Sequence, residues 1–506
     1  MPTCRLAGAL ILLFVSAVPG AAQSGVTAPR QLSLSQALDL ARRNNPTYQQ
    51  AQIGADPAAE AVKAANWARL PTLSAGGGVS YTGAGSQTFG GTTFSQSSPT
   101  VSSGYSLSAN WQLNTRNFTA PAIQKAQEQA TLAGIDGARI TLTSNVTTQY
   151  LNTLRAGAVV GVAVQQLARD TAFLELARAR QIVGQATMID VLQAQTDLAS
   201  AKVQWLQAKQ TAAQAKIELI HQIGLPTDAN VDSITLSEPF PLVQPTFDLG
   251  KLEAMAHEAN PTIQADIATQ HANELSTRAA RLDRLPTLSI SSGINGYTQQ
   301  FTNESILLNN ALAQSQGSAA GCQFQNQILA GLTTPIAGTP DCNAAAGLNS
   351  SGTALLPSVS TQIRSSNNVF PFNFTRQPIT VNFQLSLPIW DGYSRSLSIS
   401  RAAAAEDQSR EGLRAQQLTT DAAIQSQLLA VQTAWDRSTV LDSNRAVARE
   451  RLQLAQDRYR IGNGTALDVA DAQNTLTQAD ADYISAVYDY HLAVASLEAA
   501  VGRPLR

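Results

Sequence analysis

The chain has 506 residues, of which 44% are hydrophobic but only 14% are charged and 6% aromatic. Its formal net charge of −2 argues against a nucleic-acid-binding protein, because such a protein needs a basic surface to neutralise phosphates. With four histidines and three cysteines, the sequence offers little material for a metal cluster or a histidine-based catalytic site. We therefore predict neither an enzyme nor a protein with a metal or cofactor.

Residues 1–22 are predicted to form a secretory signal peptide. Arg5 supplies the positive start, residues 6–18 the apolar stretch and residues 19–22, Pro-Gly-Ala-Ala, a small-residue cleavage region. Cys4 precedes the apolar stretch and is expected to be removed with the signal. No later run reaches the roughly 18 consecutive apolar residues that a spanning helix requires, so any membrane insertion must use strands.

The mature chain contains two copies of one pattern. The segment Arg-Leu-Pro-Thr-Leu-Ser at 69–74 recurs at 284–289, an offset of 215 positions, and Asn-Pro-Thr at 45–47 recurs at the same offset. Later matches, such as Gly224 with Gly502, keep an offset of 278, so the second copy carries 63 extra residues. The predicted ranges are 23–226 for the first repeat, 227–247 for a proline-rich linker and 248–506 for the second repeat.

Each copy is predicted to contribute two strands. Residues 105–113 and 379–389 alternate apolar and polar side chains, which is the pattern of a tilted transmembrane strand with one face toward lipid and the other toward a lumen. A half-buried strand of a soluble β-sandwich is the alternative. The predicted strands lie at about 72–82, 104–113, 286–298 and 378–390.

Long segments without proline follow the second strand of each copy, and because proline is costly inside a helix they favour long helices. Apolar residues spaced alternately three and four apart, large and small in turn, form a heptad seam that indicates core packing rather than a cofactor site. The long helices are predicted at about 118–183, 187–223, 394–461 and 466–501, and shorter ones at 32–68 and 247–283, starting near Ser33 and Asp248.

The segment 300–376 is an insertion in the second copy, rich in Gly, Ser, Asn and Ala and without periodicity. We interpret it as a long extracellular loop. It contains the two cysteines of the mature chain, Cys322 and Cys342, and in an exported protein a disulfide between them is favoured over two free thiols.

Four strands are too few to close a membrane barrel, because bacterial barrels have eight or more strands and an open edge cannot face lipid. The predicted barrel must therefore be shared between chains. Two chains would supply eight strands and three chains twelve, and the coiled helices would extend the barrel on one side of the membrane.

These residues resemble the TolC-like outer-membrane efflux proteins over essentially the whole mature chain. The resemblance depends on Asn-Pro at 45 and 260, the Leu-Pro-Thr-Leu strand openings, the run 387–392 (Leu-Pro-Ile-Trp-Asp-Gly), and the Val-Gly and Ile-Gly turns. The first copy departs at 110–114, which lacks the Pro and Gly. The resemblance implies an α+β membrane protein, a homotrimer in which four strands per chain form a shared β-barrel that a coiled-coil α-helical barrel continues into the periplasm.

The resemblance also implies a gate at the periplasmic tip, where acidic residues after the turns point into the closed pore. These positions fall on Asp190, Asp468 and Asp471, and three chains would bring nine carboxylates together. An Asp near a helix start also interacts favourably with the helix dipole, which is the alternative interpretation. Tyr459 matches a residue that latches the closed tip, but Gly464 replaces the arginine that often follows it.

Two further sets of positions follow from the resemblance and the strands. Val183, Gly184, Ile461 and Gly462 match the turns on which an adaptor protein docks, although such glycines also simply permit tight turns. Trp111 and Trp390 lie at the ends of outward-facing strands, where indole rings prefer the membrane interface; packing against the adjoining helix is the alternative.

The predicted function is that of an outer-membrane channel-tunnel of a tripartite efflux or type I secretion system. It would conduct substrates passively from a periplasmic adaptor and an inner-membrane pump to the exterior, in the outer membrane of a Gram-negative cell and in contact with its lipid. No substrate pocket is evident, so specificity is expected in the pump. The alternative is a periplasmic coiled-coil scaffold or adaptor without a pore.

Overall fold

The computed structural model describes residues 31–96, 98–226, 235–236, 238, 240–331, 338 and 340–505. The signal peptide predicted at 1–22, with Cys4, lies outside these residues, as do positions 227–234, 237 and 239 of the predicted linker. The chain divides into two compact units, one of residues 1–60, 125–273 and 405–506 and the other of residues 61–124 and 274–404.

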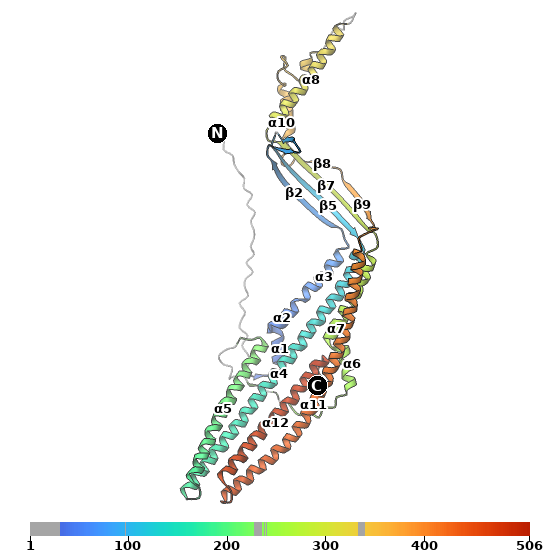
Figure 1. Cartoon of the computed structure of the whole chain (residues 1–506). Coiled ribbons are helices and arrows are strands. Elements are labelled where there is room, and N and C mark those ends of the chain that lie inside the picture. The colour runs from blue at the N-terminus through green and yellow to red at the C-terminus, as the bar shows by residue number, and fades with distance from the viewer. Residues whose placement is uncertain are drawn as a thin grey trace. The chain divides into compact units, whose positions relative to one another are not determined.

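The first unit is dominated by two antiparallel helix pairs. Figure 1 shows α4 beside α5 and α11 beside α12, with each pair joined by a short turn. A two-stranded parallel sheet, β1 (Gln31–Leu32) with β6 (Thr235–Leu236), accompanies them. The helices that lie wholly or partly in this unit are α1 (Leu34–Asn44), α2 (Pro46–Ile53), α3 (Ala55–Trp67), α4 (Thr115–Ile182), α5 (Met188–Ile223), α6 (Leu249–Ala259), α7 (Pro261–Leu282), α11 (Ser394–Arg460) and α12 (Ala466–Val501).

Equivalent residues of the two repeats make equivalent contacts. α5 and α12 are both 36 residues long. The side chain of Asn45 donates a hydrogen bond to the Gln222 carbonyl (2.8 Å), and that of Asn260 donates one to the Ala500 carbonyl (2.9 Å). The repeated Asn therefore ties a short helix to the end of the helical pair in each repeat.

A repeated glycine completes this junction. Gly224 and Gly502 end α5 and α12 with φ of 83° and 91°, in the left-handed region that suits glycine. A Cβ atom on Gly224 would lie 2.5 Å from the Asn44 carbonyl oxygen, and one on Gly502 would lie 2.9 Å from the Cα of Asn260. Neither position has room for a side chain, which explains the match at the 278-residue offset.

The segments 32–68 and 247–283 were each predicted to be a single helix, but the repeated Asn-Pro motif at 45 and 260 interrupts both of them. The first range contains three helices, with breaks at Asn45 and Gly54, and the second contains two, with a break at Asn260. The reason is local. Asn45 accepts a hydrogen bond from the Tyr48 backbone N–H as a helix cap, and the proline after each Asn has no N–H to continue the preceding helix.

The second unit is built around an antiparallel sheet in which β2, β5, β7 and β8 are neighbours in that order, and β9 also pairs with β7. The hairpin of β3 and β4 lies between β2 and β5 in sequence. The strands are β2 (Thr72–Thr82), β3 (Gly85–Phe89), β4 (Thr92–Gln96), β5 (Thr100–Leu113), β7 (Thr287–Phe301), β8 (Thr375–Arg376) and β9 (Thr380–Ser386).

The pairing register gives this sheet one apolar face and one polar face. Directly opposed residues project to the same side of a sheet, and the register pairs apolar residues with one another across β2, β5, β7 and β9. Ser74 and Ser108, on the other side, share a hydrogen bond of 2.7 Å. Pairs on the apolar side include Ala75 with Leu107, Leu107 with Ile294, Trp111 with Ile290, Ile290 with Phe383, and Leu288 with Leu385.

Three strand ends lie three or more residues from their predicted limits, and one of them is the end of β7 at Phe301, where 298 was expected. β5 begins at Thr100, where 104 was expected, and β9 ends at Ser386, where 390 was expected. Pro388 explains the earlier end of β9, because proline has no N–H to donate to a neighbouring strand. The side chain of Arg395 instead donates a hydrogen bond to the Pro388 carbonyl.

The insertion at 300–376 is not the irregular loop that was predicted. It contains α8 (Ser305–Ala330), α9 (Cys342–Ala345) and α10 (Pro357–Asn367). α8 has no charged side chain to mark a polar face, so its sequence lacks the amphipathic period by which helices are recognised. A disulfide joins Cys322 of α8 to Cys342 of α9, with the two Cα atoms 5.6 Å apart.

Candidate functional site

The candidate site is the end of the first unit where the turns at 183–187 and 461–465 lie. The two turns have the same construction. Gly184 and Gly462 have φ of 75° and 84°, and the next residue in each turn donates its backbone N–H to the carbonyl of Arg180 (2.8 Å) or Arg458 (2.9 Å). Both turns are therefore closed by a glycine in the left-handed region followed by a backbone hydrogen bond.

The threonine after each turn starts the next helix with a reciprocal cap. Thr187 donates its backbone N–H (2.7 Å) and hydroxyl (2.9 Å) to Asp190 Oδ2, and its hydroxyl oxygen accepts from the Asp190 N–H. Thr465 makes the same bonds to Asp468 Oδ2, at 2.9 and 2.8 Å. The predicted gate residues Asp190 and Asp468 are thus also the third-residue carboxylates of capping boxes.

The charge of Asp468 is favoured by its surroundings. The backbone and hydroxyl hydrogen bonds from Thr465, together with the positive charge of Arg458, lower the pKa of Asp468 below its usual value. Asp468 is exposed, so its charge is available to a ligand or an ion.

The third predicted gate residue, Asp471, forms an ion pair instead of a helix cap. Its Oδ2 lies 2.5 Å from Nη2 of Arg451 on α11. Both residues line a hollow of about 430 Å³ that Asp468 and Arg458 also line. Asp468 and Asp471 therefore share one hollow, whereas Asp190 does not line it.

Tyr459 lies at the contact between the two helical pairs. Its side chain is only 3% exposed, its ring centroid is 5.3 Å from that of Phe173, and its hydroxyl oxygen has no hydrogen-bond partner among the described residues. Burial, and to a smaller extent the charge of Asp190, raise the pKa of the Tyr459 hydroxyl, whereas Arg180 opposes the shift.

Arg180 is a residue that the sequence analysis missed. Its guanidinium lies 4.4 Å from the centroid of the Tyr459 ring, and it donates hydrogen bonds to the carbonyl oxygens of Tyr459 and, at 3.3 Å, of Gln185. The repeat offset could have drawn attention to it, since 278 positions separate Arg180 from Arg458, each three residues before its turn.

The predicted docking positions present apolar side chains at both turns. Val183 is 65% exposed and Ile461 is 72% exposed. Ile182, Ile189 and Leu467, beside them in sequence, are also exposed. Exposed apolar side chains gathered at one end of a protein are a feature of interaction surfaces.

A buried polar layer links α4, α5 and α12 away from the turns. Gln166, Asp170 and Gln473 are each at most 4% exposed. Burial first, and the charge of Asp197 second, raise the pKa of Asp170 to about 6, while Arg169 opposes the shift. The guanidinium of Arg169 donates a hydrogen bond of 3.0 Å to the Thr477 hydroxyl on α12, which joins the two helical pairs.

The two tryptophans predicted at a membrane interface have different surroundings in the second unit. Trp111 is half-buried, and its Nε1–H donates a hydrogen bond of 2.8 Å to the Arg69 carbonyl. Trp390 is 78% exposed and contacts the edge of the Tyr393 ring at a centroid distance of 6.0 Å. An interface role for either residue remains a prediction.

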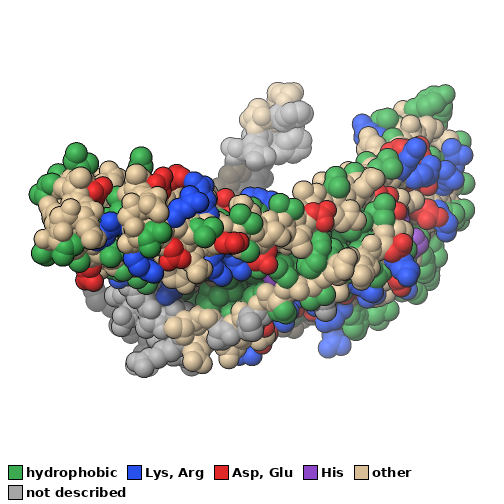
Figure 2. All heavy atoms as spheres, turned by 90° about the horizontal axis from the view of Figure 1, so that it is seen from below, with side chains coloured by type: hydrophobic (Ala, Val, Ile, Leu, Met, Phe, Trp, Pro, Cys, Tyr) green, Lys and Arg blue, Asp and Glu red, His purple; other side chains and the backbone are tan. Residues whose placement is uncertain are grey.

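The charges do not form a basic area on the face drawn in Figure 2, where acidic and basic side chains are interspersed. Among the described residues, no group of three or more His, Cys, Asp or Glu side chains could hold a metal ion. In the same part of the chain, no helix combines the length and apolar character needed to cross a membrane.

The family model described as outer membrane efflux protein matches residues 37–225 and 343–503. No curated protein matches the chain.

Solved structures share the fold at low sequence identity. A membrane protein from Pseudomonas aeruginosa matches with a TM-score of 0.67 at 19% identity, covering 95% of this chain and 92% of its own. The Campylobacter jejuni CmeC outer membrane channel matches with a TM-score of 0.66 at 14% identity, covering 93% and 85%. The outer membrane protein VceC from Vibrio cholerae matches with a TM-score of 0.66 at 15% identity, covering 94% and 97%.

Proposed function

The chain belongs to the outer membrane efflux protein family, and from this premise we propose that it is the outer-membrane channel of a tripartite efflux or type I secretion system. Three chains enclose one conduit in the outer membrane and periplasm of a Gram-negative cell. The conduit is passive, and substrates reach it from an inner-membrane pump through a periplasmic adaptor.

The observation that carries this proposal is the two-faced sheet of the second unit. Its apolar side chains are exposed: Leu73 at 76%, Phe383 at 71% and Leu385 at 70%. A soluble protein rarely exposes so many large apolar side chains on one sheet face. Lipid against the apolar face and water against the serine-rich face give each set of side chains a favourable environment, as in transmembrane barrels.

The two edges of the sheet argue for a shared barrel. Within the described residues, β2 pairs only with β5, and β9 pairs only with β7, so each edge strand leaves one side without a partner strand. Unpaired backbone groups are costly in lipid. In a ring of three chains, β2 of one chain pairs with β9 of the next, which removes every edge.

In this proposal, the end of the first unit that carries the turns at 183–187 and 461–465 supplies both the gate and the surface on which the adaptor docks. Asp468 and Asp471 supply negative charge to the closed tip and favour cations there. Val183 and Ile461 bind an adaptor through their exposed apolar side chains.

A matched pair of substitutions tests the proposal. Phe383→Asp places a charge on the apolar face, which costs about 2–4 kcal/mol at the bilayer centre for the most costly charges and less for Asp. Gln384→Asp places the same charge on the opposite face. We expect Phe383→Asp, but not Gln384→Asp, to reduce the yield of folded oligomer in outer-membrane fractions. A wild-type chain that is monomeric and soluble without detergent would instead support the scaffold alternative.

A further inference from the structure

Three arginines of α4 contact the second helical pair, and they lie on one face of the helix. Arg155, Arg169 and Arg180 are 14 and 11 residues apart, which is close to four and three whole helical turns. They span about 38 Å of α4, at about 1.5 Å per residue. Arg180 contacts Tyr459 on α11, and Arg169 contacts Thr477 on α12. Arg155, the farthest from the turns, contacts a carboxylate.

That carboxylate belongs to Asp489 of α12, and it holds two guanidinium groups. Arg155 Nη1 lies 3.2 Å from Asp489 Oδ1, and Nη1 of Arg437 on α11 lies 3.2 Å from Asp489 Oδ2. The first contact crosses from one helical pair to the other, whereas the second stays within the α11–α12 pair. The side chains of Arg155 and Asp489 are 37% and 35% exposed, so water screens this contact less than it screens a fully exposed ion pair.

Between Asp489 and the turns, the two helical pairs share an apolar contact that is built largely from small side chains. Thirteen buried residues from α4, α5, α11 and α12 form one cluster, and six of them are alanines. Phe173 and Tyr459 are its only aromatic members. Because an alanine methyl group buries little apolar area, this part of the contact opposes separation weakly.

On the other side of Asp489, away from the turns, each pair is fixed within its own repeat. The buried residues of one apolar cluster, which include Tyr150 and Leu219, all come from the first repeat. Those of another, which include Tyr490 and Leu497, all come from the second repeat. At this level the apolar packing therefore stabilises each pair separately and does not join the two.

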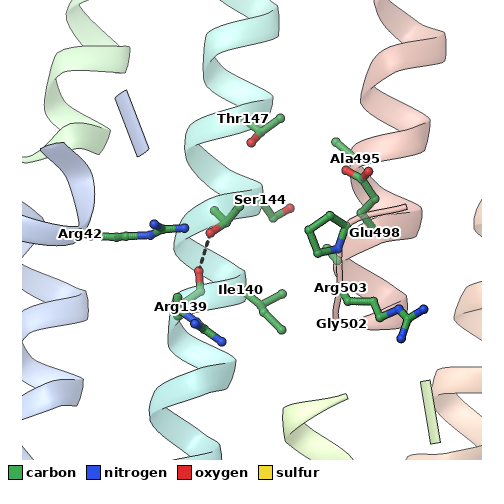
Figure 3. A pocket seen from close by; sticks show the side chains of 12 residues that line it. Arg42, Arg139, Ile140, Ser144, Thr147, Ala495, Glu498, Gly502 and Arg503 are labelled. Atoms are coloured by element: carbon green, nitrogen blue, oxygen red, sulfur yellow. Dashed lines mark hydrogen bonds between the residues drawn. The ribbon is translucent and has the colours of Figure 1, made fainter. Parts of the chain in front are cut away.

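A hollow of about 240 Å³ also lies on that side of Asp489, between α4 and α12. Figure 3 shows Thr147 on α4 facing the hollow from one side, and Ala495 and Glu498 on α12 from the other. The contact between Arg155 and Asp489 therefore marks the level at which the packed contact ends and the hollow begins.

We propose that Asp489 is the pivot of the gate at the turns, an inference that rests on the proposed channel function. When the turns part, the helical pairs separate along the alanine-rich contact from Arg180 toward Arg155, and the ion pair between Arg155 and Asp489 keeps them joined. The place of Asp489 on α12 thus limits how far the turns can part. Asp489 is a positioning residue, because it acts through the helices and touches no substrate.

Distances between paired spin labels, measured by electron paramagnetic resonance on the detergent-solubilised full chain, test the pivot. Labels at Gln185→Cys and Asn463→Cys report on the two turns, and labels at Arg139→Cys and Arg503→Cys report across the hollow. The native disulfide leaves no described cysteine free to react with the label. Labelled chain is mixed with excess unlabelled chain, so that each oligomer carries one labelled copy. We expect Arg180→Gln to lengthen the turn distance and to leave the distance across the hollow unchanged.

Two further substitutions, each added to Arg180→Gln, separate a pivot from a general loss of stability. Arg155→Gln removes the contact between the pairs, so it should lengthen the turn distance further and shift the distance across the hollow. Arg437→Gln is the matched control, because it removes the partner of Asp489 that lies within one pair, and it should change neither distance. Asp489→Glu keeps the charge and should also change neither distance. In planar bilayers, the variant with Arg155→Gln should give larger current steps than Arg180→Gln alone.

Three results would overturn the pivot. The first is an equal turn distance in the wild-type chain and Arg180→Gln, because the pairs would then not part from the turns. The second is a shift across the hollow in Arg180→Gln alone. The third is an effect of Arg437→Gln as large as that of Arg155→Gln. The distances do not depend on current, so the expected shifts in a protein without conductance would contradict the proposed channel and leave the pivot between the helical pairs in place.

Discussion

The guanidinium of Arg180 covers the ring of Tyr459, 4.4 Å from its centroid, and donates a hydrogen bond to the backbone carbonyl of the same residue. Arg180 lies in the last turn of α4 and Tyr459 in the last turn of α11, so the Arg180 side chain connects the two helical pairs beside the turns at 183–187 and 461–465. It also holds the Gln185 carbonyl of the first turn. The family resemblance predicted a latch at Tyr459, but Gly464 stands where an arginine often follows that tyrosine. We infer that Arg180 supplies the missing guanidinium of this latch.

Arg180→Gln should weaken the contact between α4 and α11 beside the turns at 183–187 and 461–465. The change removes a cation–π contact of about 0.5–2 kcal/mol and charged hydrogen bonds of about 1.5–3 kcal/mol each. We expect a lower unfolding temperature and a higher conductance of the unliganded channel. Arg178→Gln, an exposed arginine on the same helix, is the control and should change neither quantity. Equal behaviour of the two variants would exclude the latch.

The buried polar layer predicts how stability depends on pH. The pKa of Asp170 is raised to about 6 from 3.8, so the folded chain retains a proton that the unfolded chain loses. The contribution of Asp170 to stability is therefore greatest below about pH 4, falls as the pH rises to about 6, and is constant above that value. The total fall is on the order of 2–3 kcal/mol.

Asp170→Asn should remove this part of the pH dependence. Denaturant unfolding of the wild-type chain and the variant between pH 4 and pH 7 provides the measurement. Asp136→Asn, an exposed carboxylate on the same helix, is the matched control and should retain the wild-type slope. A wild-type slope in Asp170→Asn would show that Asp170 does not carry the shift; Asp197, whose pKa burial also raises, would then be the group to replace.

Asp468 can be tested for its two roles separately. Asp468→Asn removes the charge but keeps an oxygen that can accept from Thr465, so the helix cap survives. We expect nearly unchanged stability but lower cation selectivity. Asp468→Ala removes both the charge and the oxygen that completes the capping box, and should also lower stability. Unchanged reversal potentials in both variants would limit Asp468 to its capping role.

The disulfide should stabilise the insertion alone. Cys322 and Cys342 are 20 positions apart, and closing a loop of about this size contributes about 3 kcal/mol in the chain-entropy account. The variant Cys322→Ser with Cys342→Ser should expose the segment from α8 to α9 to proteases without changing the channel conductance. Proteolysis at the wild-type rate would contradict this expectation.

The sequence was informative where one chain segment determines its own structure. The heptad seams and the proline-free stretches placed α4, α5, α11 and α12 to within a few residues, because each of these signals is local. The 26-residue helix α8 was not predicted, because its uncharged sequence shows no helical period.

Contacts between distant segments could not be predicted in the same way. Arg180 reaches Tyr459 only after the two helical pairs have packed together, and Asp170 comes near Asp197 only after α4 and α5 have packed at a particular register. Similarly, a repeat offset identifies Asn45 and Asn260 as equivalent, but the carbonyl that each one reaches is known only from the fold.

The central claim is that the chain forms a conduit, and conductance across a planar bilayer tests it most directly. Purified wild-type protein should give discrete, cation-selective current steps, and Arg180→Gln should give larger ones. Protein that inserts into the bilayer as an oligomer and yet carries no current under any gating condition would contradict the account.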